Sequence, residues 1–234
     1  MNVLTQPYIR QCSLWPKSGR HILAQFDDQS VVVYQAYRPA IGSFAVANGH
    51  FGGDAFSFSR MSWIKPNFLW MMYRSGWGTK PDQEVTLGLR IRRAFFDTLL
   101  AQAVPSSWDR RYYTTQDEWA GAVRTSDVRL QWDPDHHPSG AALDRRAIQI
   151  GLRGSALHAF AGPGNRSTAT NNSVELIAES HRELLEVIDL TAFVAEQRRR
   201  ISASEELVTP TERVYRPADP LIAERLGLDS LVVI

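Results

Sequence analysis

The chain has 234 residues, of which 44% are hydrophobic and 22% charged, so it is long enough for one large globular domain or two small ones. Its formal net charge of +1 excludes a global basic field that would attract nucleic acid, and any anion site must therefore be local. The single cysteine, Cys12, excludes an internal disulfide and a zinc site made of cysteines. With no signal-peptide pattern and no apolar run of about 18 residues, the sequence predicts a cytoplasmic protein.

The first half of the chain is predicted to alternate between strands and helices. β-Branched and aromatic residues dominate segment 30–37, which indicates a strand. Gly49 and Gly76 mark the ends of two helices, because each stands where the left-handed residue after a helix belongs. The predicted elements are a strand at 30–37, a helix at 40–48, a strand at 56–64, a helix at 66–75, a strand at 84–92 and a helix at 94–103.

The second half is predicted to hold a hairpin and further helices. Thr115 and Glu118 have the spacing of a capping box, which predicts a helix start. Segment 162–172 is rich in glycine, serine, threonine and asparagine, which predicts a loop. The remaining predicted elements are strands at 128–132 and 146–152, joined by a loop at 133–140, and an amphipathic helix at 174–188.

This order of elements predicts a single α+β domain, because strands and helices do not alternate as regular βαβ units. We expect residues 21–200 to form that domain. Residues 1–20 are predicted to lie on it as an N-terminal arm, and residues 201–234 to pack on it as a C-terminal extension. The sequence contains no P-loop and no glycine-rich nucleotide fingerprint.

One stretch, residues 60–80, combines three tryptophans with two arginines and two lysines. Aromatic faces beside cations are typical of sites for a flat anionic ligand, such as a nucleotide or a nucleic-acid strand. Lys65 precedes the predicted helix, so a phosphate there would meet its ammonium group and the main-chain N–H groups of Asn67 and Phe68. The alternative is that the rings belong to the core and the cations extend to solvent. The candidates in this stretch are Arg60, Ser62, Trp63, Lys65, Tyr73, Arg74 and Trp77.

Two further segments hold candidate binding or catalytic residues. The first is the end of the strand at 30–37, because strand ends often present ligand-binding groups; an ordinary strand end is the alternative. The second is the hairpin, whose loop places carboxylates beside imidazoles; a polar loop is the commoner explanation, and we expect no metal site. The candidates are Tyr34, Gln35, Tyr37 and Arg38 in the strand, and Asp133, His136, Gln149 and Arg153 in and after the hairpin.

Four blocks of the sequence resemble the domain-of-unknown-function 4291 family. They are Val-Tyr-Gln-Ala-Tyr at 33–37, the block at 60–77 that begins Arg-Met-Ser-Trp-Ile-Lys, Gln-Trp-Asp-Pro-Asp-His at 131–136 and Arg-Ala-Ile-Gln-Ile-Gly-Leu-Arg-Gly at 146–154. The resemblance covers nearly the whole chain, about residues 5–200. The family label implies no activity by itself.

The order of the elements between residues 31 and 92 is also similar to the first half of the ADP-ribosyltransferase fold. That resemblance implies a split, mostly antiparallel mixed sheet that is flanked by helices and holds NAD in a central cleft. It further implies that the first strand contacts NAD through residues 34–38. Ser62, with Tyr73, would then lie near the nicotinamide.

The chain departs from that family at one position. Most members carry a glutamate on a late strand, where this chain has Gln149 and no acid. Either Asp133 replaces the glutamate, or the chemistry is altered or absent, because a fold alone does not establish a function.

We therefore expect an ADP-ribosyltransferase-like enzyme that binds NAD and transfers ADP-ribose to a nucleic-acid or nucleotide acceptor. The alternative is a non-catalytic module that binds nucleotides or single-stranded nucleic acid with the same surface. In the enzyme, Asp133 or Gln149 would stabilise the oxocarbenium-like transition state, and Ser62 would hydrogen-bond the nicotinamide ribose. The expected NAD contacts are Tyr34, Gln35, Tyr37, Arg38, Arg60, Trp63, Lys65, Tyr73 and Arg74, and the expected further substrate contacts are Trp77, His136 and Arg153.

Overall fold

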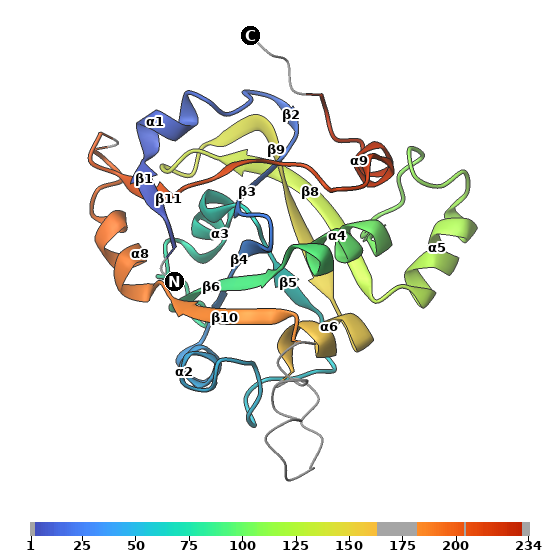
Figure 1. Ribbon diagram of the computed structural model, residues 1–234, viewed down its shortest axis with the longest axis horizontal. Helices are drawn as coiled ribbons and strands as arrows, with labels where there is room; N and C mark the ends of the chain where they lie inside the picture. The colour runs from blue at the N-terminus through green and yellow to red at the C-terminus, as the bar shows by residue number, and fades with distance from the viewer. Residues whose placement is uncertain (1–2, 163–181, 204, 231–234) are drawn as a thin grey trace.

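Two sheets form the frame of the computed structural model, which describes residues 3–162, 182–203 and 205–230 (Figure 1). The strands are β1 (Thr5–Pro7), β2 (Gly19–Arg20), β3 (Ile22–Phe26), β4 (Ser30–Tyr37), β5 (Ser62–Ile64), β6 (Val85–Arg92), β7 (Val104–Pro105), β8 (Val128–His136), β9 (Ala142–Leu152), β10 (Leu184–Asp189), β11 (Val208–Pro210) and β12 (Arg213–Tyr215). The helices are α1 (Tyr8–Cys12), α2 (Pro39–Asn48), α3 (Phe68–Ser75), α4 (Arg93–Gln102), α5 (Gln116–Thr125), α6 (Gly154–Ala161), α8 (Thr191–Arg198) and α9 (Pro220–Leu226).

The first sheet is antiparallel throughout and has the strand order β10-β6-β4-β3-β12. The second has the order β2-β9-β8-β7, with β5 also paired to β9. In the second sheet the β2–β9 and β7–β8 pairs are parallel, and the other pairs are antiparallel. The molecule is thus a mixed α+β protein, as the sequence predicted.

Strand β4 is buried on both faces, because its side chains alternate between two hydrophobic cores. Val31 and Val33 point into the larger core, which also contains residues of β6, β8, β9, α4 and α6. Val32 and Tyr34 point into a second core, where α3 and α8 pack. This double burial explains why the strand reads as an almost continuous apolar run, and the predicted strand at 30–37 is confirmed.

Main-chain hydrogen bonds join the two sheets at Lys65. Strand β5 belongs to the second sheet, and the next residue along the chain, Lys65, pairs with Tyr34 of β4 in the first sheet. The Tyr34 N–H donates to the Lys65 carbonyl oxygen at 2.7 Å, and the Lys65 N–H donates to the Tyr34 carbonyl oxygen at 3.1 Å. The segment around Lys65 is therefore fixed to both sheets by main-chain hydrogen bonds.

The helix ends and the capping box follow the sequence predictions closely. Gly49 after α2 and Gly76 after α3 are both left-handed, with φ of 68° and 59°. At the start of α5, the Thr115 side chain accepts from the Glu118 N–H, and the Glu118 carboxylate accepts from the Thr115 N–H. These features were predictable because each depends on residues only a few positions apart.

Three strand predictions have the wrong length. The predicted strand at 56–64 is confirmed only over β5, where Ser62 pairs with Leu152, the last residue of β9. In the hairpin, β8 continues to His136 and β9 begins at Ala142, so the first half of the predicted loop at 133–140 is strand.

The predicted helix at 174–188 is wrong where the structure describes it. Residues 184–189 form strand β10, which pairs with the edge of β6. Over a short segment, the same pattern of apolar residues can fit the period of a helix or that of a strand. Here the free edge of β6 favours the strand, because the segment can pair with it. The rest of that prediction, and residues 163–172 of the predicted loop, lie outside the described residues.

Segments near both ends of the chain are tied into the sheets. Strand β1 pairs with β11, so these two segments lie side by side in Figure 1. Strand β2 extends the second sheet, and β12 completes the first by pairing with β3. The segments that the sequence predicted as an arm and an extension therefore contribute strands.

In the part of the chain that the structure describes, none of the helices has the length and hydrophobicity needed to cross a membrane.

Candidate functional site

A pocket of about 670 Å³ opens beside the junction of the two sheets. Strand β4 and the start of α2 form one side of it, β5 and α3 form another, and the β8–β9 hairpin closes it. Nine of the candidate residues line this pocket, although they come from four separate segments of the chain. They are Gln35, Tyr37, Arg38, Arg60, Ser62, Trp63, Lys65, Arg74 and Gln149.

A hydrogen-bonded group of neutral side chains lies at the sheet junction. The Gln35 amide donates to Ser62 Oγ at 2.7 Å and to the Trp63 carbonyl oxygen at 3.0 Å. Tyr37 and Ser62 share a hydrogen bond of 2.7 Å between their hydroxyl groups. Burial raises the pKa of Tyr37 to about 12, so its phenol keeps its proton at neutral pH.

Gln35 has a buried acceptor that no described residue satisfies. Its side chain is only 3% exposed, and both recorded hydrogen bonds use the amide nitrogen. Its Oε1 atom has no partner. Because Gln35 lines the pocket, a ligand that presents an N–H or O–H group there would satisfy this oxygen.

The pocket concentrates positive charge. Arg38, Arg60 and Arg74 are exposed at its rim, and Lys65 is buried within it. Among the lining residues that the structure describes, Asp82 is the one acid. Four cations beside one carboxylate make a local anion site in a chain whose net charge is only +1.

Asp133 contacts the hairpin wall of the pocket without lining the pocket itself. Its two carboxylate oxygens accept hydrogen bonds from Gln131 and Gln149, each at 2.8 Å, and both glutamines line the pocket. Its negative charge also acts on Lys65, whose pKa it tends to raise. Gln131 was not among the predicted site residues, although it stands two residues before Asp133 on a strand and therefore faces the same side.

The other candidates lie away from the pocket. Tyr34 is fully buried in the second core, and Trp77 is buried with its indole N–H donating to the Pro138 carbonyl oxygen at 3.3 Å. Tyr73 stacks on the His136 ring, with 3.5 Å between ring centroids. These four side chains do not line the pocket, and we do not carry them into the proposed site.

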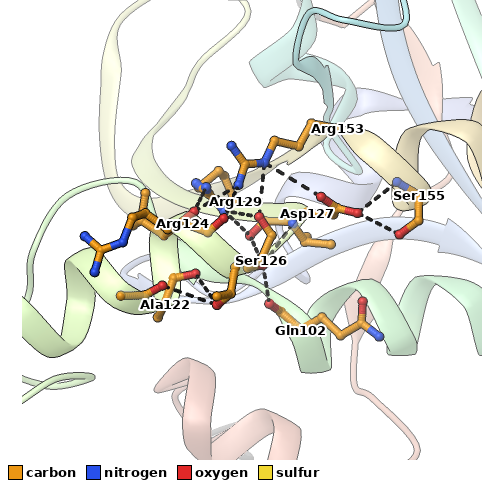
Figure 2. Close-up of polar contacts among 12 residues, drawn as sticks. Gln102, Ala122, Arg124, Ser126, Asp127, Arg129, Arg153 and Ser155 are labelled. Carbon is orange, nitrogen blue, oxygen red and sulfur yellow. Dashed lines mark hydrogen bonds and ion pairs between the residues drawn. The ribbon is translucent and has the colours of Figure 1, made fainter.

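Arg153 binds the end of a helix instead of the pocket (Figure 2). Its Nε donates to the Ser126 carbonyl oxygen at 3.1 Å, and its Nη2 donates to the carbonyl oxygens of Val123 and Arg124. Arg129 donates to the Ser126 and Val123 carbonyl oxygens from the same side. A cation at the C-terminus of α5 is favoured by the helix dipole, which accounts for both arginines.

The N-terminus of α3 is already occupied by a carboxyl group of the chain itself. The Phe68 N–H donates to Glu212 Oε1 at 2.7 Å, and the Asn67 side-chain amide donates to Glu212 Oε2 at 3.2 Å. Asn67 also caps the helix by accepting from the Trp70 N–H. The Phe68 N–H is therefore not free for the phosphate contact that the sequence predicted, because the Glu212 carboxyl group already accepts from it.

Fold and pocket together define an α+β protein with a cationic cavity where its two sheets join. The chain belongs to the family described as Domain of unknown function (DUF4291), whose model matches residues 21–215. No curated protein and no solved structure matches the chain significantly. Among the described residues, no group of three or more His, Cys, Asp or Glu side chains is placed to hold a metal ion.

Proposed function

We propose that the pocket binds a nucleotide through its diphosphate, and that the nucleotide is NAD. The observation that carries this proposal is the local excess of cations, four against one acid, around a cavity of about 670 Å³. Guanidinium groups match the geometry of phosphate oxygens and hold them by two parallel hydrogen bonds. Arg38, Arg60 and Arg74 therefore bind the diphosphate, and the half-buried indole of Trp63 offers a face for a base or nicotinamide ring.

We further propose that the chain transfers ADP-ribose from NAD. The order of β4, α2, β5, α3 and β6 along the chain, which is similar to that of the first half of the ADP-ribosyltransferase fold, supports this proposal. In that reaction the bond between the ribose C1′ and nicotinamide breaks, and its electron pair leaves with nicotinamide. An acceptor oxygen or nitrogen of a nucleotide or nucleic acid then bonds to C1′ and releases a proton. Ser62 would orient the ribose, while Asp133, held by Gln131 and Gln149, would stabilise the developing positive charge.

A second candidate is a non-catalytic module for nucleotides or single-stranded nucleic acid. The position of Asp133 favours this candidate. Its carboxylate oxygens accept hydrogen bonds from two glutamines, and Asp133 does not line the pocket itself. An enzyme of the first kind needs a carboxylate close to C1′, whereas a binding module does not. Both candidates use the same cations.

Calorimetric titration with NAD, combined with a nicotinamide-release assay, tests the proposal. We expect NAD to bind, and a free NAD concentration of 100 times Kd to stabilise the protein by about 2.7 kcal/mol through mass action. Release of nicotinamide over time supports the transferase. Binding without release supports the non-catalytic module, and no binding of NAD contradicts the proposal.

Replacing Arg74 with methionine is expected to weaken NAD binding about 10- to 100-fold. The substitution removes hydrogen bonds from a charged donor to phosphate, which contribute about 1.5–3 kcal/mol each. The matched control is Arg199→Met, because Arg199 is exposed after the end of α8 and does not line the pocket. Equal affinities of the two variants, measured by calorimetry, would show that Arg74 does not hold the ligand.

NAD affinity is expected to fall as the pH rises through about 8. Burial and the nearby Arg74 guanidinium lower the pKa of Lys65 to about 8, so the free protein loses this positive charge above that pH. A bound diphosphate favours the protonated amine, so binding above pH 8 requires uptake of a proton and weakens by up to about tenfold per pH unit. Lys65→Arg stays charged, and its affinity is expected to be flat between pH 7 and 9.5 in the same titrations.

A further inference from the structure

Lys65 differs from the other lysines of the chain. The sequence has only three lysines among 26 basic residues, and Lys17 and Lys80 are both exposed. Lys65 is 5% exposed and lines the cationic pocket. An ammonium group this buried is ordinarily found with a carboxylate partner, because an unpaired charge in the interior is strongly unfavourable.

No such partner is present within the described part of the chain. None of the carboxylates there lies within 4.0 Å of the Lys65 amine, and its one recorded hydrogen bond runs to the Trp63 carbonyl oxygen at 3.4 Å. Of the charged groups that act on it, Arg74 on α3 favours the neutral amine and Asp133 on β8 favours the ammonium form. Burial and Arg74 together outweigh Asp133, and the pKa of Lys65 falls to about 8.

Hydrogen bonds fix the main chain of Lys65. Its N–H and carbonyl groups are both bonded to Tyr34 across the sheet junction, so the start of its side chain is held at the pocket. A desolvated lysine beside another cation is the environment in which proteins make an amine nucleophilic. The arginines at the rim would at the same time bind a phosphate of the reacting molecule.

We propose that Lys65 is a nucleophilic amine that forms an imine with the carbonyl carbon of a phosphorylated aldehyde or ketone bound in the pocket. The neutral nitrogen attacks the carbonyl carbon to give a carbinolamine, which loses one water molecule to form the C=N bond. No oxidant or reductant is needed. The proposal rests on the cationic pocket that the proposed function also uses, but it does not require NAD; open-chain ADP-ribose, with its aldehyde at C1, belongs to the same chemical class.

Reductive trapping tests the proposal with pyridoxal 5′-phosphate as the probe and borohydride as the reductant. Borohydride converts the imine to a stable secondary amine, which peptide mass spectrometry assigns to one of the three lysines. At pH 8 we expect Lys65 to be labelled at least tenfold faster than Lys17 and Lys80. Labelling of Lys65 should rise with pH around a midpoint near 8, and inorganic pyrophosphate should slow it without affecting the exposed lysines.

Two controls separate a reactive site from general amine chemistry. Pyridoxal without the phosphate should label Lys65 much more slowly than pyridoxal 5′-phosphate does, because it carries no phosphate for the arginines to bind. Lys65→Arg, shown to be folded by its thermal melting curve, should lose the fast labelling phase, whereas Lys17→Arg should keep it. The proposal is overturned if Lys65 reacts more slowly than the exposed lysines, or equally fast with both aldehydes.

Calorimetric titration of the same protein with NAD distinguishes this proposal from the proposed function. If Lys65 is labelled rapidly but NAD does not bind, the nucleophilic lysine stands and the NAD proposal fails. If NAD binds and Lys65 is not labelled, the pocket serves the nucleotide and the imine proposal fails.

Discussion

Replacing Glu212 with alanine is expected to lower the free energy of unfolding by about 3 kcal/mol. Glu212 is 4% exposed, and its two oxygens accept hydrogen bonds from the Phe68 N–H and the Asn67 side chain at the start of α3. Alanine leaves both buried donors without a partner, and each unsatisfied donor costs about 1–3 kcal/mol. Urea denaturation of the two proteins at pH 7 measures the difference, and a loss below 1 kcal/mol would contradict this account of the helix start.

Glu212→Gln is the matched control, because glutamine keeps an acceptor for the Phe68 N–H. We expect it to be less destabilising than alanine and to change the pH dependence of stability. Burial raises the pKa of Glu212 well above its usual value of about 4.3, so the group contributes its stability below that value and loses it as the pH rises through the raised pKa. The glutamine variant lacks this decline, which urea melts from pH 5 to 8 would show as a flatter profile.

Glu212 also shows why part of the candidate site could not be predicted. Lys65, Asn67 and Phe68 have the local pattern of an anion site at a helix N-terminus, and the structure does place a carboxyl group there. That group belongs to a side chain 144 positions further along the chain than Phe68. No local pattern reveals a partner at that distance, because the contact exists only after the C-terminal strands have joined the sheets.

Residues that line the pocket were predictable where local rules apply. Tyr37 and Arg38 stand at the end of a strand with a clear apolar pattern. Ser62 begins a short strand, and Lys65 follows that strand before a capped helix. The pairing of β5 with β9 could not be predicted from the sequence. This pairing brings Gln149 to the same cavity. Aromatic residues predicted the pocket less well, because a tryptophan can equally pack in a hydrophobic core or contact a ligand. Trp77, for example, is buried in the core.

Replacing Arg145 with methionine is expected to destabilise the protein by about 3–5 kcal/mol, the largest effect we expect from any single substitution. Arg145 on β9 pairs with Asp135 on β8 at 2.6 Å, and their side chains are 4% and 1% exposed. Arg145 also donates to the Pro16 carbonyl oxygen and lies over the Trp15 ring, so it is not available to bind pyrophosphate as its sequence context had indicated. Removing it leaves the Asp135 carboxylate buried without its counter-ion.

A double-mutant cycle separates that unpaired charge from lost packing. Asparagine at position 135 keeps an oxygen for the His136 N–H and carries no charge, so Asp135→Asn should recover about 2 kcal/mol in the Arg145→Met background. The same exchange in the wild-type background should destabilise, because it takes away the partner of a buried guanidinium group. Urea denaturation of the four proteins gives the coupling energy, and purely additive effects would contradict the ion pair. Because this hairpin also carries Gln131, Asp133 and Gln149, the recovered double variant should bind NAD with an affinity close to that of the wild type.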